Sequence, residues 1–304
     1  MSSENRQKIA LKIVQYEQRK WCSSKNYVFI KFPIEFGCSF VDILVDSCEM
    51  TVYNYIDSVC SERKTENKGA RDIMKRVLLK LSGEALAGDK KTGFDEATCM
   101  GVAKQVKQLV DDGIQVAIVT GGGNFWRGRT SETIDRVKAD QIGMLATVMN
   151  CIYVSDIFRY AGMKTEVFTP FVCGSFTTLF SKDAAVAAME RGKVVFFAGG
   201  TGHPYFSTDT GAVLRAIEIE ADAMLLAKAI DGIYDSDPKV NPEAKKYDEV
   251  SIQEIIDKKL AAVDLTASIM CLENKMPMLV FGLNEPDSIV ETMKGTFTGT
   301  KVTV

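Results

Sequence analysis

From Met74 to the C-terminus, short apolar runs alternate with longer segments that have the periodicity of amphipathic helices. The apolar runs are about five or six residues long and the helical segments about ten to twenty, which are typical lengths for βαβ units. Because the apolar runs are nearly continuous, each strand is expected to be covered on both faces. The pattern predicts a three-layer αβα sandwich with a mostly parallel central sheet.

The predicted elements follow one another through this part of the chain. Strands are expected at residues 76–81, 114–119, 165–168, 193–197, 223–226, 278–281 and 300–304. Helices are expected at residues 95–111, 134–160, 182–191, 210–219, 265–274 and 287–293.

The first 73 residues differ in character from the rest. A polar, mixed-charge run at residues 61–71 predicts a linker, and residues 1–60 contain no recognisable site. We therefore predict an N-terminal extension and linker of unknown role at residues 1–73, and one functional domain at residues 74–304. Three interpretations of the extension stay open: a small accessory element, a partner-binding module, or sequence translated ahead of an older start at Met74.

Charge and composition exclude several classes of function. The chain has 37 Lys+Arg and 40 Asp+Glu, a net charge of −3, which argues against a general nucleic-acid binder but allows small anionic ligands. No stretch reaches 18 consecutive apolar residues, and residues 1–11 mix charged and apolar side chains, so neither a membrane span nor a secretory signal is expected. The eight cysteines form no C-x-x-C pair, which favours reduced thiols in the cytoplasm. No metal site built from protein side chains is predicted.

Glycine clusters follow three of the predicted strands. They are Ser82-Gly83, Gly121-Gly122-Gly123 and Gly199-Gly200-Thr201-Gly202. Ligands of open α/β sheets bind beyond the carboxyl ends of the strands, and glycine lets backbone N–H groups approach an anion. One such cluster is most often a simple turn, but three of them predict a phosphate site. Neither G-x-x-x-x-G-K-[ST] nor G-x-G-x-x-G occurs, so a P-loop or Rossmann site is not expected.

Two cations and one carboxylate accompany these glycines. Lys80 interrupts an apolar strand, so it either reaches solvent at a sheet edge or meets an anion at the strand end. Arg127 is either a solvated loop residue or a phosphate ligand, for which its forked geometry is suited. Asp209 begins a predicted helix, where capping is the simpler role, but it can also hold a lysine near a transferring phosphate.

Six longer motifs run through residues 74–304. They are Lys80 to Leu86, Val119 to Gly128, Asp140 to Asn150, Gly199 to Asp209, Ile217 to Asp222 and Asp231 to Pro238. In all six the chain resembles the bacterial-type uridylate (UMP) kinases of the amino-acid kinase superfamily. The resemblance implies the fold of that superfamily and a transfer of the γ-phosphoryl group of ATP to UMP, giving UDP and ADP with Mg²⁺, in pyrimidine biosynthesis.

The resemblance also implies roles for individual residues. Lys80, Arg127 and Asp209 would be catalytic, with Lys80 neutralising developing charge and Asp209 orienting the lysines. ATP would bind at Lys80, Leu81, Ser82, Gly83, Gly123, Arg127, Lys228, Tyr234 and Asp237. UMP would bind at Gly122, Asp140, Thr201, Gly202, His203, Pro204, Tyr205, Phe206, Ser207 and Thr208. A catalytic His or Cys is not required, because the attacking phosphate oxygen of UMP is already anionic.

Two residues depart from the family pattern. Lys228 lies three residues before Asp231, which leaves its role as a second phosphate lysine open, and His203 stands where Asn is common. The family further implies a homohexamer with GTP as activator and UTP as inhibitor. Residues 87–93 and the helix at 134–160 are where regulation and subunit contacts would fall, although residues 87–93 are equally a solvated charged turn.

Two other functions stay open. Kinases of the same superfold phosphorylate carbamate, glutamate or aspartate, and some relatives store metal oxoanions without catalysis. Asp140 and residues 201–208 favour a nucleotide acceptor, while Lys80, Arg127 and Asp209 favour catalysis over storage. No nucleic-acid or membrane partner is expected.

Overall fold

The computed structural model describes residues 74–126, 133–260, 262–296 and 298–304. By its contacts the chain divides into Met1–Ile73 and Met74–Val304, and only the second unit is described. The N-terminal extension and Arg127 lie outside the described residues, so the hypotheses about them stay predictions.

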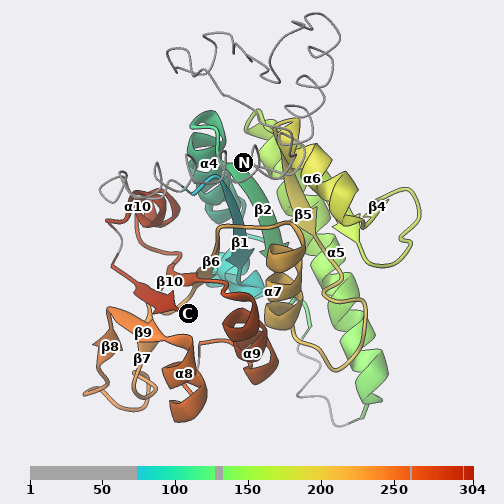
Figure 1. The fold of residues 1–304 in the computed structure, drawn as a ribbon. Helices are drawn as coiled ribbons and strands as arrows, with labels where there is room; N and C mark the ends of the chain where they lie inside the picture. Colours follow the sequence, from blue (N-terminus) through green and yellow to red (C-terminus); the bar gives the residue numbers. More distant parts are fainter. Residues whose placement is uncertain (1–73, 127–132, 261, 297) are drawn as a thin grey trace, which may run out of the picture. The chain divides into compact units, whose positions relative to one another are not determined.

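A nine-stranded sheet forms the centre of the described unit, in the order β4-β3-β5-β2-β1-β6-β10-β11-β9 (Figure 1). All neighbouring strands are parallel except β10 and β11. The strands are β1 Arg76–Leu81, β2 Gln115–Thr120, β3 Lys164–Thr169, β4 Thr178–Leu179, β5 Lys193–Phe197, β6 Ala223–Lys228, β9 Glu249–Ser251, β10 Met278–Gly282 and β11 Thr300–Thr303. Two further strands, β7 Ile233–Tyr234 and β8 Lys246–Tyr247, pair with each other.

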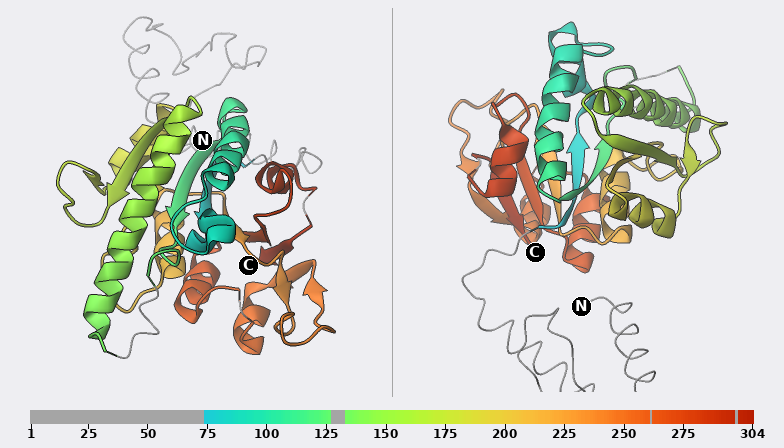
Figure 2. Two further views of the ribbon diagram at one scale, coloured as in Figure 1. Left: turned by 180° about the vertical axis from the view of Figure 1, so that it is seen from behind. Right: turned by 90° about the horizontal axis from the view of Figure 1, so that it is seen from above.

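Helices cover both faces of this sheet. One face carries α3 Gly83–Ala87, α4 Glu96–Asp111, α5 Arg136–Tyr160 and α10 Ser288–Lys294, with a short 3₁₀ turn at Gly88–Lys90 (Figure 2, left). The other carries α6 Lys182–Glu190, α7 Thr208–Glu218, α8 Ile252–Lys258 and α9 Leu265–Asn274 (Figure 1). The predicted three-layer αβα sandwich with a mostly parallel sheet is confirmed.

Strand β1 explains why the apolar runs of the sequence are continuous. Val77, Leu79 and Leu81 pack into the core under α4 and α5, while Leu78 packs into the core under α6 and α7. All four side chains are fully buried. Successive side chains of a strand point to opposite faces, so the positions of a strand that lie between two helical layers are apolar on both faces.

Polar caps fix where the helices begin. The side chains of Asp95, Ser207 and Asp264 accept the backbone N–H groups of Thr98, Thr210 and Ala267 at the starts of α4, α7 and α9. Helix α7 therefore begins at Thr208, two residues before its predicted start at 210. The short elements α3, α8, β4, β7, β8 and β9 were not predicted, because each offers too few residues for a periodic pattern.

Helix α5 has two distinct faces along its 25 residues. One face buries Cys151, Val154 and Phe158 against the sheet. The opposite face exposes an apolar stripe, Ile142, Leu145, Met149 and Ile152, with 39 to 52% of each side chain accessible. The helix is long and apolar enough to cross a membrane by length and composition, but 44% of its most apolar window is buried inside the protein. Its packing is that of a core helix with one open side.

Candidate functional site

A cavity of about 530 Å³ lies at the carboxyl ends of β1, β2 and β6, three neighbouring strands at the middle of the sheet. Its walls come from these strand ends and from the starts of α3, α7 and α9. The lining residues are Lys80, Ser82, Gly83, Glu84, Gly121, Gly122, Gly123, Ser207, Thr208, Asp209, Lys228, Ala262, Val263 and Asp264. This is the edge where open α/β sheets bind their ligands.

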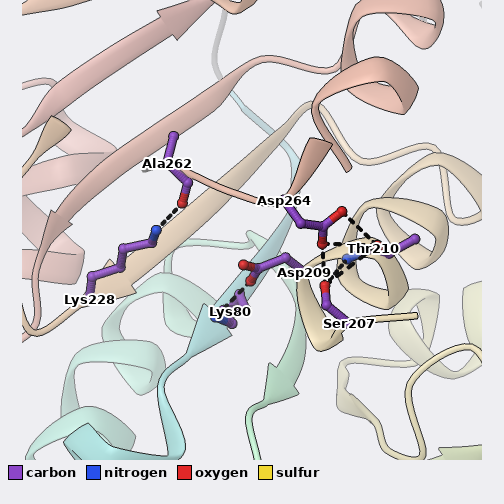
Figure 3. A network of polar contacts seen from close by, with 7 residues as sticks. All are labelled: Lys80, Ser207, Asp209, Thr210, Lys228, Ala262 and Asp264. Carbon is purple, nitrogen blue, oxygen red and sulfur yellow. Dashed lines mark hydrogen bonds and ion pairs between the residues drawn. The ribbon is translucent and has the colours of Figure 1, made fainter. Parts of the chain in front are cut away.

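Lys80 and Asp209 form an ion pair inside the cavity (Figure 3). The distance from Lys80 Nζ to Asp209 Oδ1 is 2.7 Å, and the two side chains are 12% and 21% exposed. Strand β1 lies between β2 and β6, so Lys80 is not at a sheet edge, and the solvent-edge interpretation is wrong. Asp209 lies in the first turn of α7, where the helix dipole stabilises a negative charge.

Lys228 brings a second ammonium group to the same cavity. It is the last residue of β6, and its Nζ donates a hydrogen bond to the carbonyl of Ala262 (Figure 3). Burial lowers the pKa of Lys228, Asp209 opposes that shift, and Lys80 adds to it. Two lysines thus face one carboxylate, an arrangement that attracts a further anion.

Asp264 ties the start of α9 to the start of α7. Its carboxylate accepts hydrogen bonds from the hydroxyls of Ser207 and Thr210, the latter at 3.0 Å from Oδ2 (Figure 3). It also accepts the backbone N–H of Ala267 at 3.0 Å. Burial alone would raise the pKa of Asp264, but these hydrogen bonds outweigh it and the pKa is lowered. The network fixes the segment that carries Ser207, Thr208 and Asp209.

Two of the three glycine clusters are in direct contact in the cavity. A Cβ on Gly83 would lie 2.4 Å from the carbonyl oxygen of Gly121, which is closer than real Cβ contacts. The N–H of Gly121 donates to the carbonyl of Leu81 at 3.0 Å, and a Cβ on Gly122 would lie 3.0 Å from the carbonyl oxygen of Gly143 on α5. Glycine is therefore required here for close backbone approach.

The third glycine cluster packs beside the cavity without lining it. The N–H of Gly199 donates to Thr147 Oγ1 of α5 at 2.8 Å, and a Cβ on Gly211 of α7 would lie 3.1 Å from Gly200 Cα. Further along this loop, the N–H of Tyr205 donates to Asp140 Oδ2 of α5 at 2.8 Å. Helix α5 thus holds the loop between β5 and α7 at two points.

Asp140 is engaged by its own helix as well. Its Oδ2 accepts from Arg136 Nε at 2.8 Å, and the Arg136 guanidinium lies 5.3 Å from the centre of the Tyr205 ring. In the described part of the chain, no hydrogen bond to Asp140 Oδ1 is present. Asp140 therefore positions Tyr205 through Oδ2, and its Oδ1 accepts no hydrogen bond from the described residues.

The structure gathers many of the predicted site residues but not all. The cavity brings together Lys80, Ser82, Gly83, Gly122, Gly123, Ser207, Thr208, Asp209 and Lys228. Leu81 is fully buried in the core, and Asp140 and the residues Thr201, Gly202, His203, Pro204, Tyr205 and Phe206 lie outside the cavity lining.

Tyr234 and Asp237 also lie outside this lining. The hydroxyl of Tyr234 donates to Asp231 Oδ1 at 2.7 Å, and Asp237 Oδ1 accepts the N–H of Lys239 at 2.9 Å. Both side chains therefore stabilise the segment that follows β6.

The cavity also contains residues that sequence reasoning missed. They are Ala262, Val263 and Asp264, while Glu84 and Gly121 lie inside predicted motifs but were given no role of their own. The sequence signal for Asp264 was its place one residue before the predicted helix at 265–274, which indicated a cap and nothing more. Its contact with Ser207 depends on the fold, because α7 and α9 pack side by side only in the folded unit.

Comparisons with known proteins agree with this fold. The model of the amino acid kinase family matches residues 75–282. The crystal structure of UMP kinase from Bacillus anthracis is 35% identical over 76% of this chain and 96% of that chain, with a TM-score of 0.73.

Two further structures are similar. UMP kinase from Ureaplasma parvum is 33% identical over 76% of this chain and 99% of that chain, with a TM-score of 0.72. Uridylate kinase from Archaeoglobus fulgidus is 25% identical over 74% of this chain and 99% of that chain, with a TM-score of 0.58.

Proposed function

Because this chain belongs to the amino acid kinase family, we propose that it is a UMP kinase, which transfers the γ-phosphoryl group of ATP to UMP and releases UDP and ADP. The observation that carries the proposal is the cavity in which Lys80, Lys228 and Asp209 meet two glycine clusters. Phosphoryl transfer needs positioned positive charge and backbone N–H donors, and this cavity supplies both.

The lysines support a site for the phosphates of ATP. Lys80, next to Ser82 and Gly83, would bind the phosphate that is transferred and neutralise the charge that develops on it. Lys228 would bind the same phosphate chain from β6, and Asp209 would hold Lys80 in place. Leu81, Gly123, Tyr234, Asp237 and Arg127 complete the proposed ATP site, with Arg127 on the transfer path.

The acceptor is proposed to bind beside the second and third glycine clusters. Gly122 and the segment Thr201 to Thr208 would contact UMP, and Oδ1 of Asp140 would accept a ribose hydroxyl. The phosphate oxygen of UMP attacks the γ-phosphorus of ATP, the bond to the β,γ-bridging oxygen breaks, and ADP leaves. No strong general base is needed, because the attacking oxygen is already anionic.

Mg²⁺ is proposed to enter with ATP. Magnesium keeps several waters and is usually bound through substrate phosphates and one or two carboxylates. Within the described residues no group of three or more His, Cys, Asp or Glu side chains could bind a metal ion, but Asp209 lines the cavity beside the proposed phosphates. The ion would offset phosphate charge there, together with Lys80 and Lys228.

The test is UDP formation by the purified full-length chain from ATP, Mg²⁺ and UMP. Carbamate, glutamate and aspartate replace UMP in parallel reactions, and ADP release is measured in each. Phosphorylation of one of these acceptors but not of UMP would leave the fold and change the substrate. Tight ATP binding with no product from any acceptor would instead favour a nucleotide-binding or storage protein.

We also propose that the chain assembles as a homohexamer through the apolar stripe of α5. This proposal is supported by the exposure of the stripe, because exposed apolar patches commonly mark contact surfaces. The stripe consists of Ile142, Leu145, Met149 and Ile152. Leu145→Glu is expected to lower the molar mass measured by light scattering, while Lys182→Glu on α6 leaves it unchanged. GTP and UTP are then added to the rate assay as proposed activator and inhibitor.

A cytoplasmic location is proposed as well. Cys99, Cys151, Cys173 and Cys271 are free thiols in the structure, which is the form that a reducing compartment maintains. Residues 74–304 would form the catalytic domain and residues 1–73 an extension. A truncated chain starting at Met74 tests the extension. If its activity and its assembly are both unchanged, the hypothesis that the extension is a partner-binding module is contradicted.

A further inference from the structure

Two buried asparagines behind the cavity form a reciprocal amide pair. Asn124 follows the triple glycine, and Asn150 lies on α5. Nδ2 of Asn124 donates to Oδ1 of Asn150 at 3.0 Å, and Nδ2 of Asn150 donates to Oδ1 of Asn124 at 2.8 Å. The residues are 1% and 0% exposed. Burying an amide is unfavourable unless it is hydrogen-bonded, so two buried amides that satisfy each other form a specific contact.

The pair also holds the backbone of the glycine cluster. Nδ2 of Asn150 donates a second hydrogen bond, at 2.6 Å, to the carbonyl of Gly121. The N–H of the same Gly121 donates to the carbonyl of Leu81 at the end of β1. Gly121 is therefore held from two sides, by β1 through its N–H and by α5 through its carbonyl.

The second donor of Asn124 reaches a different segment. Its Nδ2 donates to the carbonyl of Gly93 at 2.9 Å, and the N–H of Gly93 donates to the carbonyl of Asn124 at 3.3 Å. The pair thus also anchors the turn between α3 and α4, which follows directly on the helix that begins at Gly83.

The start of α3 rests on atoms that this pair fixes. A Cβ placed on Gly83 would lie 2.4 Å from the carbonyl oxygen of Gly121 and 2.7 Å from Oδ1 of Asn124. Both oxygens belong to the hydrogen-bonded group around Asn150. The separation between the Ser82-Gly83 segment and the Gly121-Gly122-Gly123 segment is therefore determined by where Asn124 and Asn150 hold these two oxygens.

We infer that Asn124 and Asn150 are positioning residues for phosphoryl transfer. They set the spacing between the Ser82-Gly83 segment, proposed to bind the donor phosphates, and the triple glycine, proposed to contact UMP at Gly122 and ATP at Gly123. Neither asparagine lines the cavity. The inference rests on the proposed function for its catalytic meaning, while the effect of the pair on the order of the glycine segment can be measured without substrate.

A double-mutant cycle separates this role from general stability. Asn150→Leu alone leaves the amide of Asn124 buried without its partner, and Asn124→Leu does the converse, so each lowers Tm. In the double variant both amides are replaced by apolar groups of similar size, so Tm is expected to recover part of the combined loss. In the double variant the carbonyl of Gly121 still lacks the hydrogen bond from residue 150, so the spacing between the two glycine segments is not restored.

The matched control is Val154→Ala. Val154 is fully buried on the same helix, one turn beyond Asn150, but packs into the sheet core and not onto the glycines. Its truncation lowers Tm by leaving a cavity and is expected to keep kcat within about twofold. Asn150→Leu and the double variant are expected to lower kcat by about 10- to 100-fold, with smaller changes in KM, because misplacement of reacting groups acts on the chemical step.

Hydrogen exchange gives a reading that does not depend on activity. Amides of residues 121–126 are expected to exchange faster in Asn150→Leu and in the double variant, but at the wild-type rate in Val154→Ala. If the wild type makes no UDP, the proposed function fails, yet the exchange result still tests whether Asn150 holds the glycine segment in place. Unchanged exchange in Asn150→Leu, or a double variant that regains both Tm and kcat, would overturn the inference.

Discussion

Asp209 of α7 reaches across the cavity to place its carboxylate 2.7 Å from the ammonium group of Lys80 on β1. The ion pair joins a strand at the centre of the sheet to the first turn of a helix that lies more than a hundred residues further along the chain. Both partners are mostly buried, so their orientation is set by the fold and is maintained before any nucleotide arrives.

Lys80→Ala is expected to lower kcat by about 10² or more, because the cavity loses a group that stabilises charge in the transition state. The protein should stay folded, as judged by circular dichroism and Tm. Lys182→Ala, which removes an exposed ion pair with Glu220 outside the cavity lining, is the control and should leave kcat unchanged. Near-normal turnover in Lys80→Ala would remove this residue from the mechanism.

Lys228 is expected to shape the alkaline side of the pH profile. Burial lowers its pKa below the ordinary 10.5, so the free enzyme loses this positive charge at a lower pH than an exposed lysine would. The kcat/KM for ATP, which reports the free enzyme, should fall with a midpoint below pH 10.5.

Lys228→Met tests this assignment. The variant is expected to have a kcat/KM about tenfold or more below the wild type at neutral pH, because one phosphate ligand is lost. Its alkaline limb should also disappear. An alkaline limb that persists at the same midpoint would assign the titration to another group.

Gly83→Ala is expected to raise KM for ATP and to destabilise the protein by about 1–3 kcal/mol, because its methyl group would overlap the Gly121 carbonyl. Gly101→Ala is the matched control. Gly101 lies inside α4 with nothing within 4 Å of an added Cβ, so alanine there should stabilise the protein by about 0.5–1 kcal/mol. Urea denaturation and initial-rate assays measure both effects, and a tolerated Gly83→Ala would contradict the close contact.

Asp264→Asn is expected to make stability depend less on pH. Hydrogen bonds hold the pKa of Asp264 below its ordinary 3.8 in the folded state, so its contribution is fully present above pH 3.8 and is lost as pH falls through the lower folded value. The variant should therefore be less stable than the wild type at pH 7 and approach it in acid.

The test is to measure Tm of Asp264→Asn and of the wild type at several pH values between 7 and 3 and to compare the two. Asp183→Asn, at an exposed position of α6, is the control and should change Tm little across the range. A difference between Asp264→Asn and the wild type that stays constant down to pH 3 would show that the charge of Asp264 is unimportant.

The layered fold could be predicted because burial on both faces leaves a direct trace in the sequence. Four of the six residues of β1 and four of the five residues of β5 are buried, and short apolar runs of this kind are typical of strands between two helical layers. The short elements have no comparable sequence pattern. Strands β7 and β8 have two residues each, and they are strands only because they pair antiparallel with each other in the folded chain. Helix α8 is a seven-residue segment whose buried face is too short to reveal a period.

The site was predictable where it depends on strand ends and not where it depends on helix packing. Lys80, Gly83 and Gly122 follow strands, so their convergence is a consequence of a parallel sheet. Asp264 and Asn150 were given no role from the sequence, because it does not show that α9 meets α7 or that α5 meets the triple glycine. Arg127 lies outside the described residues and stays a prediction.

The position of β1 also bears on how the chain is made. It is the first described strand to leave the ribosome, yet it occupies the middle of the sheet, between β2 and β6. Its edge toward β6 has no partner until residues 223–228 have been synthesised, and unpaired strand edges are sites of aggregation. From the synthesis of residue 81 until that of residue 223, the growing polypeptide therefore carries a central strand with an unpaired edge, and the cavity gains its last wall only after Asp264 has emerged.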